Sequence, residues 1–299
     1  MSTHGITHAE MRAVNLPRRK AMNRLMELVS TLAALIAVAI LGIVVWSVAK
    51  RGAGALNLNL ITKDPAIAFS FGAVKQGLAN AFAGSLVIVG IATAMALPTG
   101  ILVAVYLTEF APALVRNAVS LVLDVLNGIP AIVIGIFVYG LLVIGHGQSG
   151  WAGGFALACL MLPLVTRSTM EVLLLVPSSL REASLALGVP RWRTTLSIVL
   201  PQTVGGVLTG TVLAVARVAG ETAPLLFTSS YVSTHTSWDP SHALQSIPVA
   251  IYELSESPDP ADHTRAWAAA LVLLLFIMFA SLGARWLATR SKRRLSTSR

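Results

Sequence analysis

Long stretches without a charged residue recur along this chain and constrain its fold more than any other feature. No Asp, Glu, Lys or Arg lies between Lys75 and Glu109. A helix needs about 20 mostly apolar residues to cross the ~30 Å hydrocarbon core of a bilayer. Runs of this kind predict membrane-spanning helices at residues 28–49, 83–107, 119–144, 151–176, 203–228 and 266–284. We therefore expect an all-α, polytopic integral membrane protein with six transmembrane helices.

The composition excludes several classes of protein. Charged residues make up 12% of the chain, whereas a soluble globular protein carries about 25% because its surface faces water. A soluble enzyme, a disordered chain and a nucleic-acid binder are excluded, despite the net charge of +9. The single cysteine, Cys159, lies in an apolar run, so neither a disulfide framework nor a thiolate metal site is expected.

The basic residues predict the topology. Sixteen of the 22 lie before the first span, after the last span, or in the connections after the second and fourth spans, when Arg167 near the end of the fourth span is counted with the connection that follows. Five lie on the opposite side, and Arg217 lies inside the fifth span. Because loops rich in Lys and Arg stay in the cytoplasm, both termini are expected to be cytoplasmic. The first apolar stretch is longer than the ~7–15 apolar residues of a cleaved signal peptide, so we interpret it as a retained anchor.

The same pattern divides the chain into five parts. We expect a basic N-terminal arm, a first transmembrane helix, an external loop, a core of five further transmembrane helices and a basic tail, at residues 1–27, 28–49, 50–78, 79–288 and 289–299.

Four prolines fall inside the predicted spans, at Pro98, Pro130, Pro163 and Pro224. Each removes a backbone donor and kinks its helix. A bilayer tolerates this only where protein or a water-filled cavity satisfies the freed carbonyl groups. Kinked, glycine-rich spans favour a bundle around a pathway, although any single proline could be purely structural.

No catalytic site or metal site is predicted. A phosphate-binding P-loop needs a glycine directly before its lysine, and none of the five lysines follows a glycine. Nothing resembles a Ser/His/Asp or Cys/His nucleophile system. If ATP powers this protein, another chain hydrolyses it.

The longest cytoplasmic connection holds a short helix, predicted at about residues 179–188. Ser178 or Ser179 is the expected N-cap, with Glu182 in the first turn. Gly188 and Pro190 are expected to end the helix. A short apolar helix held out in the cytoplasm predicts a groove on a partner protein.

The spacing in this connection resembles the signature of ABC import permeases. Glu182-Ala183-Ser184, Gly188 and Ile198-Val199-Leu200-Pro201 match it at every anchored position except Ser184, where that family has alanine. The resemblance implies a coupling helix that docks on an ATPase subunit through Glu182, Ala183, Ser184, Leu187 and Gly188. The alternative is an ordinary amphipathic turn.

The fifth predicted span carries Arg217 and Glu221, which are four residues apart and would share a helix face. Each charge costs about 2.5–3.5 kcal/mol at a helix centre, so such residues face a partner or a cavity. The planar guanidinium suits a tetrahedral oxyanion. Glu221 could accept from the hydroxyl of protonated phosphate, which ionised sulfate lacks. Alternatively, the two side chains form an ion pair that only aids packing.

Three stretches, residues 97–109, 128–137 and 216–228, resemble the permeases of phosphate-specific ABC transporters, and the second favours their A-type subunit. The third stretch reads Ala-Arg-Val-Ala-Gly-Glu-Thr-Ala-Pro-Leu over its first ten residues. The resemblance implies that Arg217 and Glu221 move phosphate, with Thr222 in the same string. Asp124, one turn before Gly128, is a further candidate for the pathway, and a hydrogen-bonded structural role is the alternative.

The resemblance also implies the assembly and its location. A second homologous permease, two ATPase subunits that hold ATP and Mg²⁺, and an extracytoplasmic phosphate-binding protein would surround this chain in the bacterial inner membrane. No cofactor is expected in this chain. Three alternatives remain: an ABC permease for sulfate or molybdate, a proton-coupled secondary carrier, and a membrane-anchored scaffold.

Overall fold

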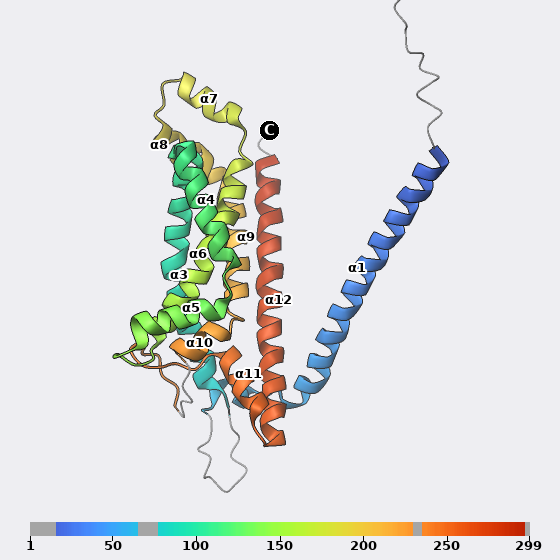
Figure 1. The fold of residues 1–299 in the computed structure, drawn as a ribbon, viewed down its shortest axis with the longest axis vertical. Helices are drawn as coiled ribbons and strands as arrows, with labels where there is room; N and C mark the ends of the chain where they lie inside the picture. Colours follow the sequence, from blue (N-terminus) through green and yellow to red (C-terminus); the bar gives the residue numbers. More distant parts are fainter. Residues whose placement is uncertain (1–15, 65–76, 230–234, 297–299) are drawn as a thin grey trace, which may run out of the picture. The chain divides into compact units, whose positions relative to one another are not determined.

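The computed structural model describes residues 16–64, 77–229 and 235–296. It divides the chain into two compact units, Met1–Arg51 and Gly52–Arg299, which are considered separately. All regular structure among the described residues is helical (Figure 1). The expected arm, external loop and tail each extend into residues outside the described ranges.

The first unit contains one long helix, α1, whose bounds are Leu16–Gly52. The predicted span 28–49 lies inside it. Its apolar side chains surround the helix, and none of the residues in its most apolar window is buried. A helix that is apolar on all sides needs a lipid or protein environment.

The second unit contains eleven α-helices among the described residues. Their bounds are α2 Leu58–Thr62, α3 Ala79–Val105, α4 Ala113–Gly128, α5 Ala131–Val138, α6 Gly150–Leu174, α7 Ser178–Ala186, α8 Arg191–Thr194, α9 Leu200–Val218, α10 Ala223–Thr228, α11 Ile247–Glu256 and α12 Pro260–Ser296. A 3-10 turn, Ala53–Ala55, precedes α2. Wider π-helical turns, Tyr106–Phe110, Tyr139–Val143 and Thr195–Val199, extend α3 and α5 and join α8 to α9.

Helices α3 and α6 form the core of this unit. Their interface buries Ile88, Leu157, Met161 and Val165 completely. Glycine allows the close approach: a Cβ added to Gly154 would lie 2.5 Å from Ile91 Cγ2. Small residues at such interfaces let helix backbones pack tightly in a membrane.

The third predicted span, 119–144, is wrong as a continuous helix. The chain leaves α4 at Gly128 and enters α5 at Ala131, with a bend of 98° between the two helices. Ile129 is extended, with φ −70° and ψ 129°. Proline at 130 explains this, because it disfavours helical backbone at the preceding residue and donates no hydrogen bond.

The fifth predicted span, 203–228, also differs from the structure. The long apolar helix runs over Arg191–Val218, and a separate helix, α10, begins at Ala223. Gly220 and Glu221 lie in the turn between them, and Pro224 occupies the first turn of α10. A proline is tolerated in the first turn because the N–H group that it lacks would have no acceptor within the helix. Pro98 and Pro163, by contrast, lie inside α3 and α6 as predicted.

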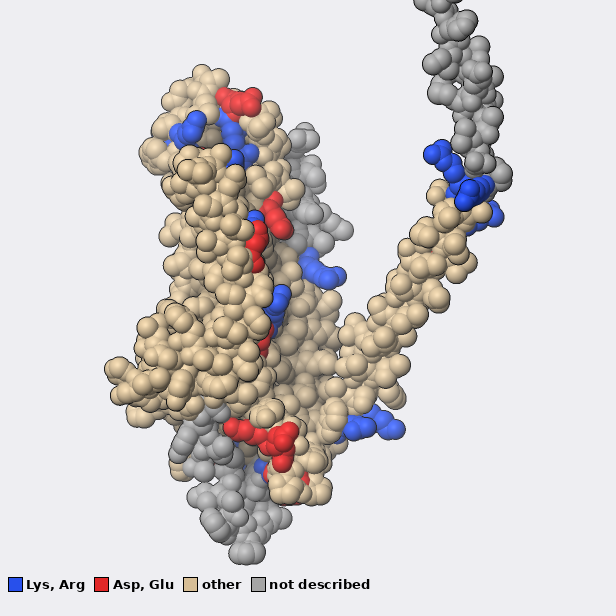
Figure 2. All heavy atoms as spheres, in the orientation of Figure 1, with Lys and Arg blue, Asp and Glu red and all other residues tan. Residues whose placement is uncertain are grey.

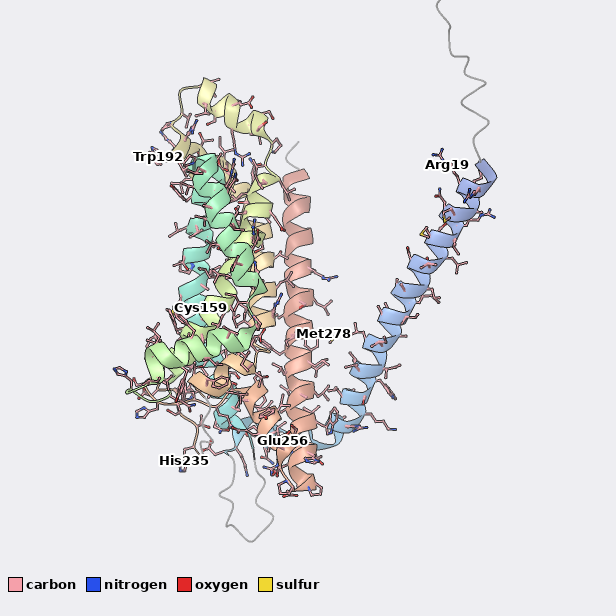
Figure 3. All side chains as sticks on the ribbon, viewed as in Figure 1. Arg19, Cys159, Trp192, His235, Glu256 and Met278 are labelled. Carbon is pink, nitrogen blue, oxygen red and sulfur yellow. The ribbon has the colours of Figure 1, made fainter. Side chains whose placement is uncertain are left out.

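The prediction of an all-α polytopic protein is confirmed. Five helices among the described residues are long and apolar enough to cross a membrane, and the bent pair α4–α5 raises the number to six. Helix α7 and the end of α12 lie at one end of the second unit, and α10 and α11 lie toward the other (Figure 1). Trp192 and Glu256 mark these two ends in Figure 3.

Candidate functional site

The two helix breaks meet at one cavity of about 270 Å³. Its wall includes Asn127, Pro130 and Ala131 from the first break and Arg217 and Glu221 from the second. Leu160 and Leu164 of α6 also line it. The structure thus brings the two charges predicted for the fifth span to a common cavity, within the membrane-spanning part of the chain.

A larger cavity of about 500 Å³ lies between α3, α11 and α12 and is apolar. Phe82, Leu86, Trp238 and Phe276 line it, and none of the described residues in its wall is charged. Since an anion needs donors or positive charge, the smaller cavity is the candidate site.

Helix α5 packs on α10, which holds the two breaks together, and the two backbones approach closely at Gly135. A Cβ added to Gly135 would lie 2.6 Å from Pro224 Cα. This distance is too short for any side chain, and the obstructing atom belongs to the backbone. The contact therefore requires glycine at 135.

Replacing Gly135 by Val is expected to destabilise the protein by about 1–3 kcal/mol, the usual cost of overpacking. The midpoint of thermal unfolding of the purified protein measures this. Gly140→Val is the matched control, because a Cβ at Gly140 meets nothing within 4 Å. Equal midpoints for the two variants would contradict the close contact between α5 and α10.

Arg217 and Glu221 do not share a helix face, contrary to the prediction. Arg217 lies in the last turn of α9, whereas Glu221 follows the end of that helix. Arg217 is exposed and Glu221 is half-buried. None of the ion pairs among the described residues joins Arg217 to Glu221. The alternative of an ion pair that only aids packing is therefore not formed in the described structure. The guanidinium is available to an anion.

Thr222 and Asp124, the other two pathway candidates, lie outside the cavity wall. Thr222 is the N-cap residue of α10, but its side chain makes no capping bond. Asp124 forms an ion pair with Arg167 of α6, whose Nη2 also donates to the Ser120 carbonyl at 2.9 Å. The ion pair supports the structural role that the sequence left open for Asp124, and a pathway role stays a prediction.

Arg167, which the sequence places near the end of the fourth span, lies inside α6 and is half-buried. Together with Asp124, Arg217 and Glu221 it forms the set of membrane-spanning charges that we term the charged face. In Figure 2, acidic and basic side chains follow one another along the length of the second unit.

The predicted coupling helix is α7, Ser178–Ala186. The expected end at Gly188 is correct: its φ is +78°, which glycine adopts without strain. The N–H of Val189 donates to the Ser184 carbonyl at 3.2 Å and that of Gly188 to the Leu185 carbonyl at 2.9 Å. These two bonds form a Schellman motif, which satisfies the last carbonyls of a helix.

The start of α7 differs from the prediction. Pro177 is the N-cap residue, and no side chain caps the helix. Ser178 and Ser179 lie inside the helix, and its first turn holds no acidic residue, so Glu182 lies beyond it. Proline explains the boundary, because its fixed φ allows the extended ψ of 137° that precedes the first helical residue.

Ser184 has a different role from the one predicted. Its side chain is buried, and its hydroxyl lies 2.8 Å from the hydroxyl of Thr194 in α8. The serine therefore joins two helices of this chain and is not exposed to a partner. The apolar side chains that α7 and its neighbours do expose are Leu180, Leu185, Leu187 and Trp192.

The ion pair between Arg181 of α7 and Glu109 was not predicted from the sequence. The two residues are 72 positions apart. No local pattern relates residues so far apart, and only the packing of α3 beside α6 brings them together.

Comparison with known proteins gives a consistent result. The model of the family described as "Binding-protein-dependent transport system inner membrane component" matches residues 96–293. A protein of Haemophilus influenzae named "Phosphate transport system permease protein PstA" is 39% identical over 87% of this chain and 91% of its own length. A Xylella fastidiosa protein of the same name is 37% identical over 92% of this chain and 95% of its own length.

Solved structures show the same fold at low sequence identity. A bacterial alginate ABC transporter in complex with its periplasmic protein has a TM-score of 0.61 at 16% identity, covering 91% of this chain and 96% of that one. The MetNI methionine ABC transporter has a TM-score of 0.56 at 17% identity, covering 72% and 94%.

Proposed function

Since the chain belongs to the family of binding-protein-dependent transport system inner membrane components, we propose that it is a permease subunit of an ATP-driven importer of inorganic phosphate. The observation that carries the proposal is the cavity between the two helix breaks, where Arg217 and Glu221 lie without forming an ion pair. The names of the relatives support phosphate over sulfate or molybdate.

The cavity has the chemistry that a phosphate ion needs. Irregular backbone inside a bilayer is tolerated where it lines a water-filled space, and both breaks do so here. The planar fork of Arg217 can donate two parallel hydrogen bonds to one oxyanion. A carboxylate at Glu221 can accept from the P–OH group of protonated phosphate but would repel a fully ionised anion. The start of α5 also lies at this cavity and adds a partial positive charge.

The charged face supports a pathway between two permeases. Asp124 and Arg217 are exposed in the isolated chain, and Arg167 and Glu221 are half-buried. Lipid contact would cost several kcal/mol for each charge, so this face must meet water or protein. A second, homologous permease covering it would enclose the route for the anion. An extracytoplasmic phosphate-binding protein would deliver phosphate at the end that carries α10 and α11.

The opposite end suits an ATPase. Helix α7 exposes apolar side chains there, and the nearby Arg191 and Arg193 are exposed too. Two ATPase subunits, holding ATP and Mg²⁺, would dock at α7 and at its counterpart in the second permease, so that this chain needs no nucleotide site. Closure of the ATPases would push on α7 and switch the spans between outward-facing and inward-facing states. The end of α12 lies at the α7 end, in agreement with a cytoplasmic C-terminus (Figure 1).

Reconstitution of the complex in vesicles tests the proposed function. Phosphate uptake is expected to require ATP, the ATPase subunits and the binding protein. Uptake by this chain without any ATPase would instead identify a proton-coupled secondary carrier. Uptake of sulfate or molybdate in preference to phosphate would contradict the assignment of the substrate.

Replacing Glu221 by Gln is expected to reduce the preference for phosphate over sulfate roughly tenfold or more. A hydrogen bond to a charged group contributes about 1.5–3 kcal/mol, and about 1.4 kcal/mol corresponds to a factor of ten. Competition between the two anions for uptake measures the preference. Glu171→Gln is the matched control, because Glu171 is an exposed carboxylate of α6 outside the cavity wall. An unchanged preference in Glu221→Gln would exclude this role.

A further inference from the structure

The guanidinium of Arg181 joins three helices at the end of the molecule that carries α7. Its Nε lies 3.2 Å from both carboxylate oxygens of Glu109, and its Nη2 lies 2.8 Å from Oε1. It also donates from Nη1 to the Val176 carbonyl at 2.6 Å and from Nη2 to the Leu173 carbonyl at 2.9 Å. Glu109 lies in the π-helical turn that extends α3, Leu173 lies in the last turn of α6, and Val176 follows the end of that helix.

This contact is largely shielded from water. The side chain of Arg181 is 23% exposed and that of Glu109 is 9% exposed. Charge-assisted hydrogen bonds are stronger than neutral ones, and the two-pronged geometry also fixes the relative orientation of the partners. A lysine could not reach the carboxylate and both carbonyls at once, because its ammonium is a single point on a flexible stem.

Helix α7 has few other attachments. Among the described residues, the only other side-chain hydrogen bond that leaves α7 joins Ser184 to Thr194 of α8. Both of its ends are breaks in the helical backbone, at Pro177 and at Gly188. A short helix whose two ends are non-helical turns can change its orientation without moving the transmembrane helices. The side-chain hydrogen bonds of α7 therefore determine which transmembrane helices move with it.

We propose that the Arg181–Glu109 pair is a strut that passes a displacement of α7 to α3 and α6. The proposal rests on the proposed function in one respect, that an ATPase pushes on α7. Helices α3 and α6 would move together, because their glycine-mediated interface leaves no free space between them. The Ser184–Thr194 contact is the corresponding link to α8 and, through it, to α9. Arg181 and Glu109 are thus positioning residues, distant from the phosphate cavity.

A labelling experiment on the reconstituted complex tests the strut. The single cysteine is removed by Cys159→Ser, and a reporter is placed in the cavity wall by Ala131→Cys. The rate of modification by a membrane-impermeant maleimide is then measured with and without ATP and vanadate. We expect Glu109→Gln to leave ATPase binding and ATP hydrolysis in place but to reduce the nucleotide-dependent change in rate roughly tenfold, or about 1.4 kcal/mol of coupling. For Arg181→Lys, the nucleotide-dependent change in labelling rate should be intermediate between those of Glu109→Gln and the unaltered chain.

Arg116→Gln is the matched control, because it removes an exposed charge near the start of α4 that forms no ion pair among the described residues and lies outside the surface assigned to the ATPase. Its labelling rate should respond to ATP and vanadate as that of the unaltered chain does. A normal nucleotide response in Glu109→Gln would overturn the proposal. Loss of ATPase binding in both Glu109→Gln and Arg181→Lys would also overturn it, since the pair would then only hold the fold.

The readout uses no phosphate, so it separates the strut from the proposed substrate. If phosphate is not the substrate, the unaltered complex takes up no phosphate but its labelling still responds to nucleotide. If only the strut is wrong, phosphate uptake and the nucleotide response both persist in Glu109→Gln.

Discussion

Replacing Arg217 by Gln is expected to lower phosphate uptake by roughly ten- to a hundredfold while the subunits still assemble. The variant keeps a side chain of similar shape but removes the only positive charge that the described residues contribute to the cavity wall. Hydrogen bonds to a charged group contribute about 1.5–3 kcal/mol, and each 1.4 kcal/mol or so is a factor of ten. Uptake of labelled phosphate into vesicles, compared with co-purification of the ATPase, measures the two effects separately.

A second variant shows whether the charge or the shape of Arg217 matters. Arg217→Lys keeps the charge without the planar fork, and it should retain more uptake than Arg217→Gln but less than the unaltered chain. Loss of assembly in Arg217→Gln would favour a packing role. Normal uptake in that variant would refute the assignment of the cavity.

Replacing Gly188 by Val should weaken ATPase association by about tenfold. The residue has a φ of +78°, where a side chain costs about 1–2 kcal/mol and β-branched residues are rare. The variant would strain the Schellman motif and redirect Leu187, the most exposed leucine of the described residues at 83%. Pull-down of the ATPase by the purified permease measures the association, and phosphate uptake should fall with it.

Gly145 provides the control for this prediction. Its φ is +84°, and like Gly188 it has nothing within 4 Å of an added Cβ. Gly145→Val therefore introduces the same backbone strain far from α7. If both variants lost the ATPase equally, the effect would be general instability, and α7 would not be the docking site.

Much of this architecture could be predicted from local patterns. The helices that begin at Ala79 and Gly150 follow from apolar length alone, because no other structure satisfies the backbone in a bilayer. The end of α7 at Gly188 follows from the residue type, since few residues accept positive φ. The importance of Arg217 and Glu221 follows from the cost of placing charges in an apolar span.

Other features were not predictable, because they depend on contacts between distant segments. Pro130 indicated a kink, but a bend of 98° requires α10 as a surface for α5. Ser184 resembled a small residue facing a partner, and only the approach of Thr194 shows that it is an internal link.

Local sequence patterns were sufficient to predict the membrane class, most of the spans and the coupling motif, because apolar length, charge and backbone preference are properties of single segments. The packing of the helices was needed to show that Arg217 and Glu221 flank a cavity without pairing, that Asp124 pairs with Arg167, and that Arg181 binds Glu109. Each of these depends on which helices pack together, and the sum of many weak, non-directional contacts sets that packing.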